Sequence, residues 1–206
     1  MRILILLLAA SAAWAQGQRD FLTEDEADQI RLIQEPNERL ALYLKFARLR
    51  LELVKQTLAV EKPGRSRLIH NNLEDYGRII AAMDNVIDDA LARKVDVGKG
   101  VALVAEQEKQ FLATLEEFNA VKAKDRYLYE FVLKDSLEAT QDSLEESQHD
   151  LKERAHRVVD QDFREKKERE SMMTVKDVER KKEEAAKEEK KARKAPTLRR
   201  KGEKPQ

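Results

Sequence analysis

The apolar residues between positions 69 and 90 constrain the fold more than any other feature of the sequence. They recur at alternating intervals of four and three residues: Ile69, Leu73, Tyr76, Ile80, Met83, Ile87 and Ala90. This spacing places all of them on one side of an α-helix, in the heptad pattern that packs helices against each other. A helix with so long an apolar seam must bury it against other helices. We therefore predict an all-α protein.

Start and stop signals divide the rest of the chain into further helices. A capping box of Thr23 and Glu26 starts a short helix that ends before Pro36, and Pro36 suits the first turn of a second helix. Single capping residues start a third, a fourth and a long fifth helix: Ser66, Asp96 and Asp125. Short connections favour antiparallel neighbours. We predict an antiparallel helical bundle of about four long helices plus the short N-terminal helix. Helical hairpins that close only as a dimer are the alternative.

The second predicted helix carries apolar residues on two sides. Its inner stripe contains Leu40, Leu44, Ala47, Leu51, Val54 and Leu58. Its outer stripe contains Leu42, Phe46, Leu49 and Leu53. Two residues along a helix turn by about 200°, so the stripes face nearly opposite ways. The inner stripe can face the bundle, whereas the outer stripe needs the short first helix or a second chain. We predict self-association through the outer stripe.

Glu108 interrupts the apolar stripe of the fourth predicted helix. The other members of this stripe are Val97, Val101, Val104, Phe111, Leu115 and Phe118. We favour the simpler interpretation, in which Glu108 lies at the end of the core and reaches solvent or pairs with Arg48 or Arg50. The alternative is a buried carboxyl group with a raised pKa.

The fifth predicted helix has an apolar row and a polar row on the same seam. Leu137, Leu144, Leu151 and Val158 recur every seven residues, and Thr140, Ser147 and Arg154 lie between them. Because half of this seam is polar, we expect its packing to weaken toward the end of the helix.

Two Glu-x-x-His pairs also fall on the fifth predicted helix: Glu146 with His149, and Glu153 with His156. Di-iron carboxylate bundles take such pairs from different helices and point them into the core. Here both pairs share one helix and are offset from its leucine row, so we interpret them as a solvated charged surface. A weak surface site for Zn²⁺ or Cu²⁺ is the alternative. We predict no catalytic residues and no cofactor.

The first fifteen residues have the pattern of a secretory signal peptide. Arg2 precedes an apolar run that ends in Ala13-Trp14-Ala15, a small-residue cleavage pattern. A helix needs about 20 apolar residues to span a bilayer, and this run is shorter. We therefore expect the chain to be exported to a periplasm or beyond. It contains no cysteine, so we expect no disulfide framework there.

Charge divides the exported part of the chain. The formal net charge is zero, but basic residues gather toward the end. We expect a helical bundle domain over 16–163, a highly charged helical or coiled-coil extension over 164–194 and a disordered basic tail over 195–206. The residues that could attract anionic lipid or lipopolysaccharide are Lys190, Lys191, Arg193, Lys194, Arg199, Arg200 and Lys201. Export argues against nucleic acid as the partner.

Residues 22–30, LTEDEADQI, resemble the Leu-Thr-x-x-Gln opening of small periplasmic helical stress chaperones. Glu26 stands where that pattern has glutamine. The two-sided second helix, the uneven charge and the lack of a recognisable catalytic constellation lead us to expect an exported, non-enzymatic protein. We expect it to act in binding, scaffolding or chaperone-like interaction at the cell envelope, as a homo-oligomer or with an envelope protein. The alternative is a metal- or ligand-binding bundle, sensor or enzyme, that uses the carboxylate and histidine groups of the fifth helix.

Removing residues 190–206 should weaken adsorption to anionic vesicles at low salt, because the deletion takes away the basic run that lipid phosphates attract. Co-sedimentation of the complete and shortened chains with anionic vesicles measures this. Vesicles of neutral lipid are the control and should bind both chains alike. Equal adsorption of the two chains to anionic vesicles would rule out the tail as an anchor.

Overall fold

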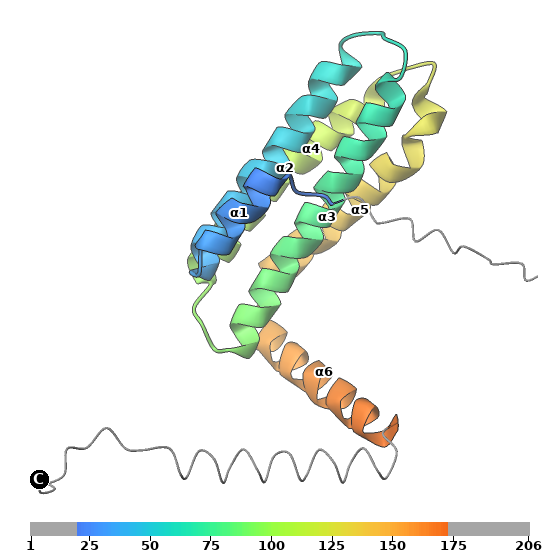
Figure 1. Ribbon diagram of the computed structural model, residues 1–206. Helices are drawn as coiled ribbons and strands as arrows, with labels where there is room; N and C mark the ends of the chain where they lie inside the picture. The colour runs from blue at the N-terminus through green and yellow to red at the C-terminus, as the bar shows by residue number, and fades with distance from the viewer. Residues whose placement is uncertain (1–19, 173–206) are drawn as a thin grey trace, which may run out of the picture. The chain divides into compact units, whose positions relative to one another are not determined.

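The computed structural model describes residues 20–172 (Figure 1). Every regular element in this range is a helix, which confirms the all-α prediction. The expected signal peptide and the basic residues from Lys190 to Lys201 lie outside the described residues. None of the helices in 20–172 is both long and apolar enough to cross a membrane.

The described chain forms six α-helices and one short 3-10 helix. They are α1 Glu24–Leu32, α2 Pro36–Leu58, α3 Arg65–Ala92, α4 Gly98–Ala120, η1 Arg126–Leu128, α5 Glu130–Gln148 and α6 Leu151–Met172. The capping box of α1 is confirmed, since the Thr23 N–H donates to Glu26 at 2.8 Å and the Glu26 N–H donates to the Thr23 hydroxyl at 3.3 Å. Helix α2 begins at Pro36, as predicted.

Four helices pack around the core. Helix α2 packs against α3 and α4, and α5 packs against the same two helices. The Gly100 N–H at the start of α4 donates to Asn37 at the start of α2, and Arg65 at the start of α3 binds Asp125 just before α5. Helices α2 and α4 therefore start at one end of the bundle, and α3 and α5 start at the other (Figure 1).

The connection between α3 and α4 does not make them neighbours. Only a few residues separate α3 from α4, yet these two are not among the closely packed helix pairs of the described range. The expectation that every short connection joins packing neighbours is wrong at this point. The chain crosses the bundle here, so α3 can pack against both α2 and α5.

The predicted apolar seams form the core. All seven residues of the 69–90 seam are at most 1% exposed. The predicted stripe of α4, including Glu108, is also buried, as is the inner stripe of α2 up to Val54. The ring of Tyr76 meets the ring of Phe111 edge to face at 5.9 Å between centroids.

Helix α1 covers part of the outer stripe of α2. Arg50 of α2 donates to both carboxylate oxygens of Glu26 in α1, at 2.9 and 2.6 Å. Phe46, one turn before Arg50, is buried, and Leu42 is half-buried. Phe46 is therefore not open to a second chain, which corrects the surface expected from the sequence. Leu49 and Leu53 remain 46% and 37% exposed.

The long fifth helix predicted from Asp125 is not continuous, which is a second correction. The Asp125 carboxylate does not cap a helix but accepts hydrogen bonds from Arg65 and Ser66. Helix α5 begins only at Glu130 and ends at Gln148, and α6 begins at Leu151. In the break, Asp150 accepts the Lys152 N–H at 2.8 Å, as a helix-capping side chain does.

Contacts divide the described residues into two compact units after Arg154. Residues 20–154 contain α1 to α5 and the first residues of α6, and the remainder of α6 belongs to the second unit. This remainder exposes Phe163 and Met172. The boundary expected between the bundle and the charged extension, near residue 164, lies within α6 and stays a prediction.

Replacing Gly100 with alanine should destabilise the fold by about 1–3 kcal/mol, because the new Cβ would lie 2.7 Å from Leu40 Cδ1 and 2.8 Å from Asn37 Oδ1. Gly77 in α3 is the matched control, since nothing lies within 4 Å of its added Cβ. There alanine should stabilise the fold by about 0.5–1 kcal/mol, because glycine is unfavourable inside a helix. Urea unfolding of both variants measures the difference. Equal stability would contradict the close approach of α2 to α4.

Candidate functional site

The polar row of α5 faces the core more deeply than its leucine row. The buried hydroxyl residues follow a heptad spacing: Ser136, Thr140, Ser143 and Ser147. Leu137, Leu144 and Leu151 are only half-buried. The seam predicted for this helix is therefore present, but its polar members are the ones enclosed by the bundle. They bring hydrogen-bonding groups opposite α3 and α4.

Thr140 is the centre of a short hydrogen-bond chain between α3 and α5. Its hydroxyl donates to the carbonyl oxygen of Ser136 at 2.7 Å. The Tyr76 hydroxyl lies 2.7 Å from the same Thr140 oxygen. Because Thr140 has one proton and gives it to Ser136, Tyr76 is the donor in this contact. Burial raises the pKa of Tyr76, which keeps the phenol protonated.

Glu108 lies inside the bundle with no hydrogen-bond partner on either carboxyl oxygen. Its exposed fraction is 0%. The pairing with Arg48 or Arg50 that we favoured is wrong. Arg48 donates to Gln107, and Arg50 donates to Glu26. The alternative, a buried carboxyl group, describes this residue correctly.

The surroundings of Glu108 favour its protonated form. Burial raises the pKa of Glu108 to about 8, and the charge of Asp84 adds to this rise, whereas Ser143 and Arg154 oppose it. Ser143 has one proton to donate, and its oxygen already lies 3.2 Å from Asp84 Oδ1. Ser143 therefore gives its proton to Asp84 and not to Glu108, and at neutral pH the Glu108 carboxyl group is mostly protonated.

Arg154 binds the acidic side of α3. Its Nε donates to Asp88 at 2.8 Å and its Nη2 donates to Asp84 at 3.2 Å. Arg154 is 4% exposed, and its third nitrogen, Nη1, has no hydrogen-bond partner. Burial raises the pKa of Asp84, while Arg154 and Ser143 lower it.

These residues form one polar cluster, which we call the Glu108 cluster. Its members are Tyr76, Asp84 and Asp88 of α3, Glu108 of α4, Thr140 and Ser143 of α5, and Arg154 of α6. Glu108 and Thr140 are fully enclosed, so the inner part of the cluster does not meet solvent. Such an arrangement can hold or release a proton, and it can fix the positions of α3, α4, α5 and the start of α6.

The two Glu-x-x-His pairs do not share one helix surface, which corrects the sequence-based view. Glu146 lies in α5 and His149 in the break, whereas Glu153 and His156 follow in α6. The His149 Nε2 atom lies 3.9 Å from Glu145 rather than near a second histidine. Within residues 20–172, no group of three or more His, Cys, Asp or Glu side chains could hold a metal ion.

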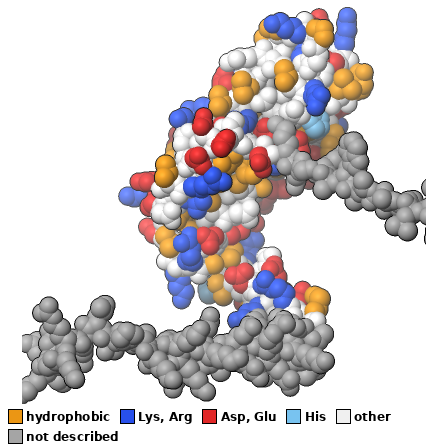
Figure 2. All heavy atoms as spheres, viewed as in Figure 1, with side chains coloured by type: hydrophobic (Ala, Val, Ile, Leu, Met, Phe, Trp, Pro, Cys, Tyr) orange, Lys and Arg blue, Asp and Glu red, His pale blue; other side chains and the backbone are white. Residues whose placement is uncertain are grey.

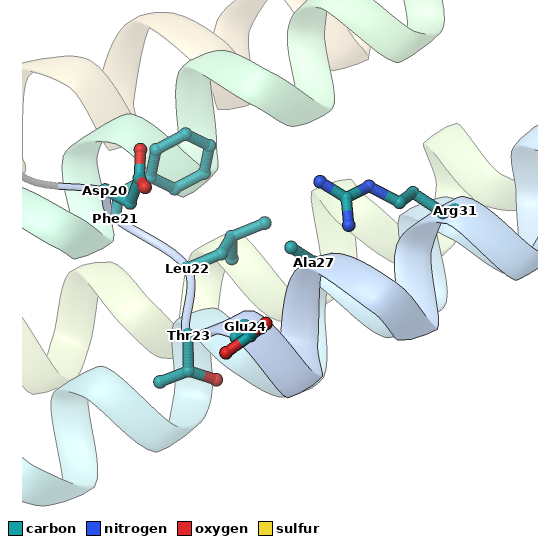
Figure 3. A pocket seen from close by; sticks show the side chains of 7 residues that line it. All are labelled: Asp20, Phe21, Leu22, Thr23, Glu24, Ala27 and Arg31. Atoms are coloured by element: carbon teal, nitrogen blue, oxygen red, sulfur yellow. The ribbon is translucent and has the colours of Figure 1, made fainter.

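A hollow of about 520 Å³ lies beside α1 and is lined by no member of the Glu108 cluster. Figure 3 shows its lining residues. Asp20 and Phe21 lie at one end of it and Arg31 at the other, with Leu22 and Ala27 between them. All lining residues belong to one short stretch, Asp20 to Arg31. Acidic and basic side chains are interspersed over the visible surface of the bundle (Figure 2). Neither feature gathers chemically reactive groups.

Comparison with known protein families, with curated proteins and with solved structures finds no match to this chain.

Replacing Arg154 with methionine should destabilise the bundle by about 2 kcal/mol, because Asp84 and Asp88 would lose the cation that both of them bind. The loss stays below that of a fully buried pair because both carboxylates reach solvent. Urea unfolding measures it. Lys152→Met, at an exposed position in the same helical turn, is the control and should change stability little. An equal effect of the two substitutions would show that the Arg154 ion pairs do not contribute.

Proposed function

We propose that this chain is an exported, non-enzymatic helical protein that acts in binding, scaffolding or chaperone-like interaction at the cell envelope. One observation carries the binding part of this proposal. After α1 has covered Phe46, Leu49 and Leu53 still expose 46% and 37% of their surface on a helix that is otherwise charged on that side. Adjacent exposed leucines on one helix face offer an apolar surface that a partner can cover.

We take the partner to be a second copy of this chain. The strip consists of the exposed Leu49 and Leu53 and the half-buried Leu42. Lys45 and Glu52 follow one of its edges, seven residues apart. If a second α2 lies antiparallel on this strip, Lys45 of each copy faces Glu52 of the other. A two-fold interface needs such self-complementary surfaces.

The size of the strip sets the expected affinity. Stable interfaces bury at least about 1,200 Å² in total, which is more than three leucines of each copy provide. The association should therefore be weak and depend on concentration. The expected signal peptide, the charged coiled-coil extension and the basic tail support a role in the cell envelope, and they remain proposals from the sequence.

Replacing both Leu49 and Leu53 with glutamine should abolish self-association, because the strip loses its apolar surface. Sedimentation velocity between about 1 and 100 μM, within the range expected for a small interface, measures it. Leu103→Gln is the control, since Leu103 of α4 has the same 37% exposure as Leu53. A wild-type chain that stays monomeric over this range would disprove the proposed partner.

A charge exchange tests the antiparallel geometry. Lys45→Glu alone should weaken association, because it places like charges opposite Glu52 of the other copy. Adding Glu52→Lys to the same chain should restore it. If the double variant does not regain self-association, the antiparallel arrangement is wrong. The leucine strip itself is tested by the Leu49 and Leu53 substitutions.

A further inference from the structure

We propose that Glu108 is a proton-binding site within the bundle, and that its bound proton keeps α4 packed against α3 and α5. The proposal is independent of the binding function above, because Glu108 is enclosed and takes no part in the exposed strip on α2.

The enclosure of Glu108 favours a bound proton on its carboxyl group. The residues one turn before and after it on the buried stripe of α4 are Val104 and Phe111, which are themselves buried. No donor reaches either carboxyl oxygen of Glu108. An ionised carboxylate without donors or a paired cation is strongly disfavoured away from water, whereas a protonated carboxyl group is tolerated.

The groups that face Glu108 from the neighbouring helices also favour its protonated form. Helix α3 contributes Tyr76 and the acidic Asp84, and Arg154 at the start of α6 is the nearby cation. Helix α5 contributes hydroxyl groups and no charge. The contact of Arg48 with Gln107 aligns this part of α4 with a turn of α2 whose core-facing residues are apolar: Leu44, Ala47 and Leu51.

Arg154 gives the proton a structural consequence. It is bound to Asp84 and Asp88, but its Nη1 is buried without a hydrogen-bond partner. If Glu108 loses its proton, the new negative charge competes with both aspartates for this guanidinium group. Release of the proton should therefore loosen the contacts between α3, α4 and α5 around Glu108.

The direction of the pH effect follows from linkage. The pKa of Glu108 is about 8 in the folded protein against an ordinary value of 4.5, so between these values the folded chain binds more protons than the unfolded chain. The stabilising contribution is complete below pH 4.5, is lost as pH rises toward 8, and stays absent above it. One proton changes the unfolding equilibrium constant by up to about tenfold per pH unit in this window.

Urea unfolding of the full chain between pH 5 and pH 9 tests the proposal, with Glu108→Gln as the variant. The unfolding equilibrium constant of the wild type should rise with pH relative to the variant, by up to about tenfold per unit. Glu106→Gln, an exposed position on the same helix, is the matched control and should follow the wild type. His70, His149 and His156 occur in all three chains, so they do not distinguish the chains in this comparison.

A direct titration covers the case in which Glu108→Gln does not fold. The carbon-13 signal of the Glu108 side-chain carboxyl, followed in the folded wild type, should titrate near pH 8. Amide hydrogen exchange in α4 and α5 around Glu108, corrected for intrinsic rates, should increase above that pH. A Glu108 signal that titrates near pH 4.5, or equal pH slopes for wild type and Glu108→Gln, would overturn the proposal.

Discussion

The burial of the α3 seam is the interaction on which the remaining structure depends. Its seven residues are almost completely enclosed, and each large apolar side chain so buried contributes about 1.5–3 kcal/mol. The sum is comparable with the whole stability of a small domain. The same helix also carries the polar groups that position the other elements. These contacts are Asp75 with Arg50 of α2, Tyr76 with Thr140 of α5, and Asp84 and Asp88 with Arg154.

The polar residues inside this bundle reduce its apolar contact area but make its packing specific. Two hydroxyl groups of α5 donate to local carbonyl oxygens, Ser136 to that of Val132 and Thr140 to that of Ser136. Glu108 has no hydrogen-bond partner and is tolerated in the core because it remains protonated. A core made only of leucine would allow α5 to pack in several positions along its axis. Hydrogen bonds between defined residues allow only one of these positions. The same groups make part of the stability depend on pH.

Helix α1 decides how much of α2 is available to other molecules. The guanidinium group of Arg50 binds Glu26 of α1. It also forms a longer ion pair with Asp75 of α3, at 3.9 Å. Burial pushes the pKa of Glu26 up, but the hydrogen bonds from Arg50 and Thr23 outweigh it and hold this pKa below its ordinary value. The ion pair thus keeps α1 in place at neutral pH. What remains open on α2 is a narrow leucine strip, suited to weak self-association.

The sequence by itself determined the helices and their apolar seams, because helical periodicity and capping are local properties. It predicted the seam of α3, the capping box at Thr23 and the position of Glu108 within an apolar stripe. Only the tertiary structure decided that α3 and α4 lie across the bundle, that α1 covers Phe46, and that the chain breaks before Leu151. It also decided that Glu108 lacks a cation partner while Arg154 binds two aspartates of α3. These outcomes depend on which helices meet, and residues some 60 positions apart (Arg154 and Asp88, 66 positions) carry no local signal of their contact.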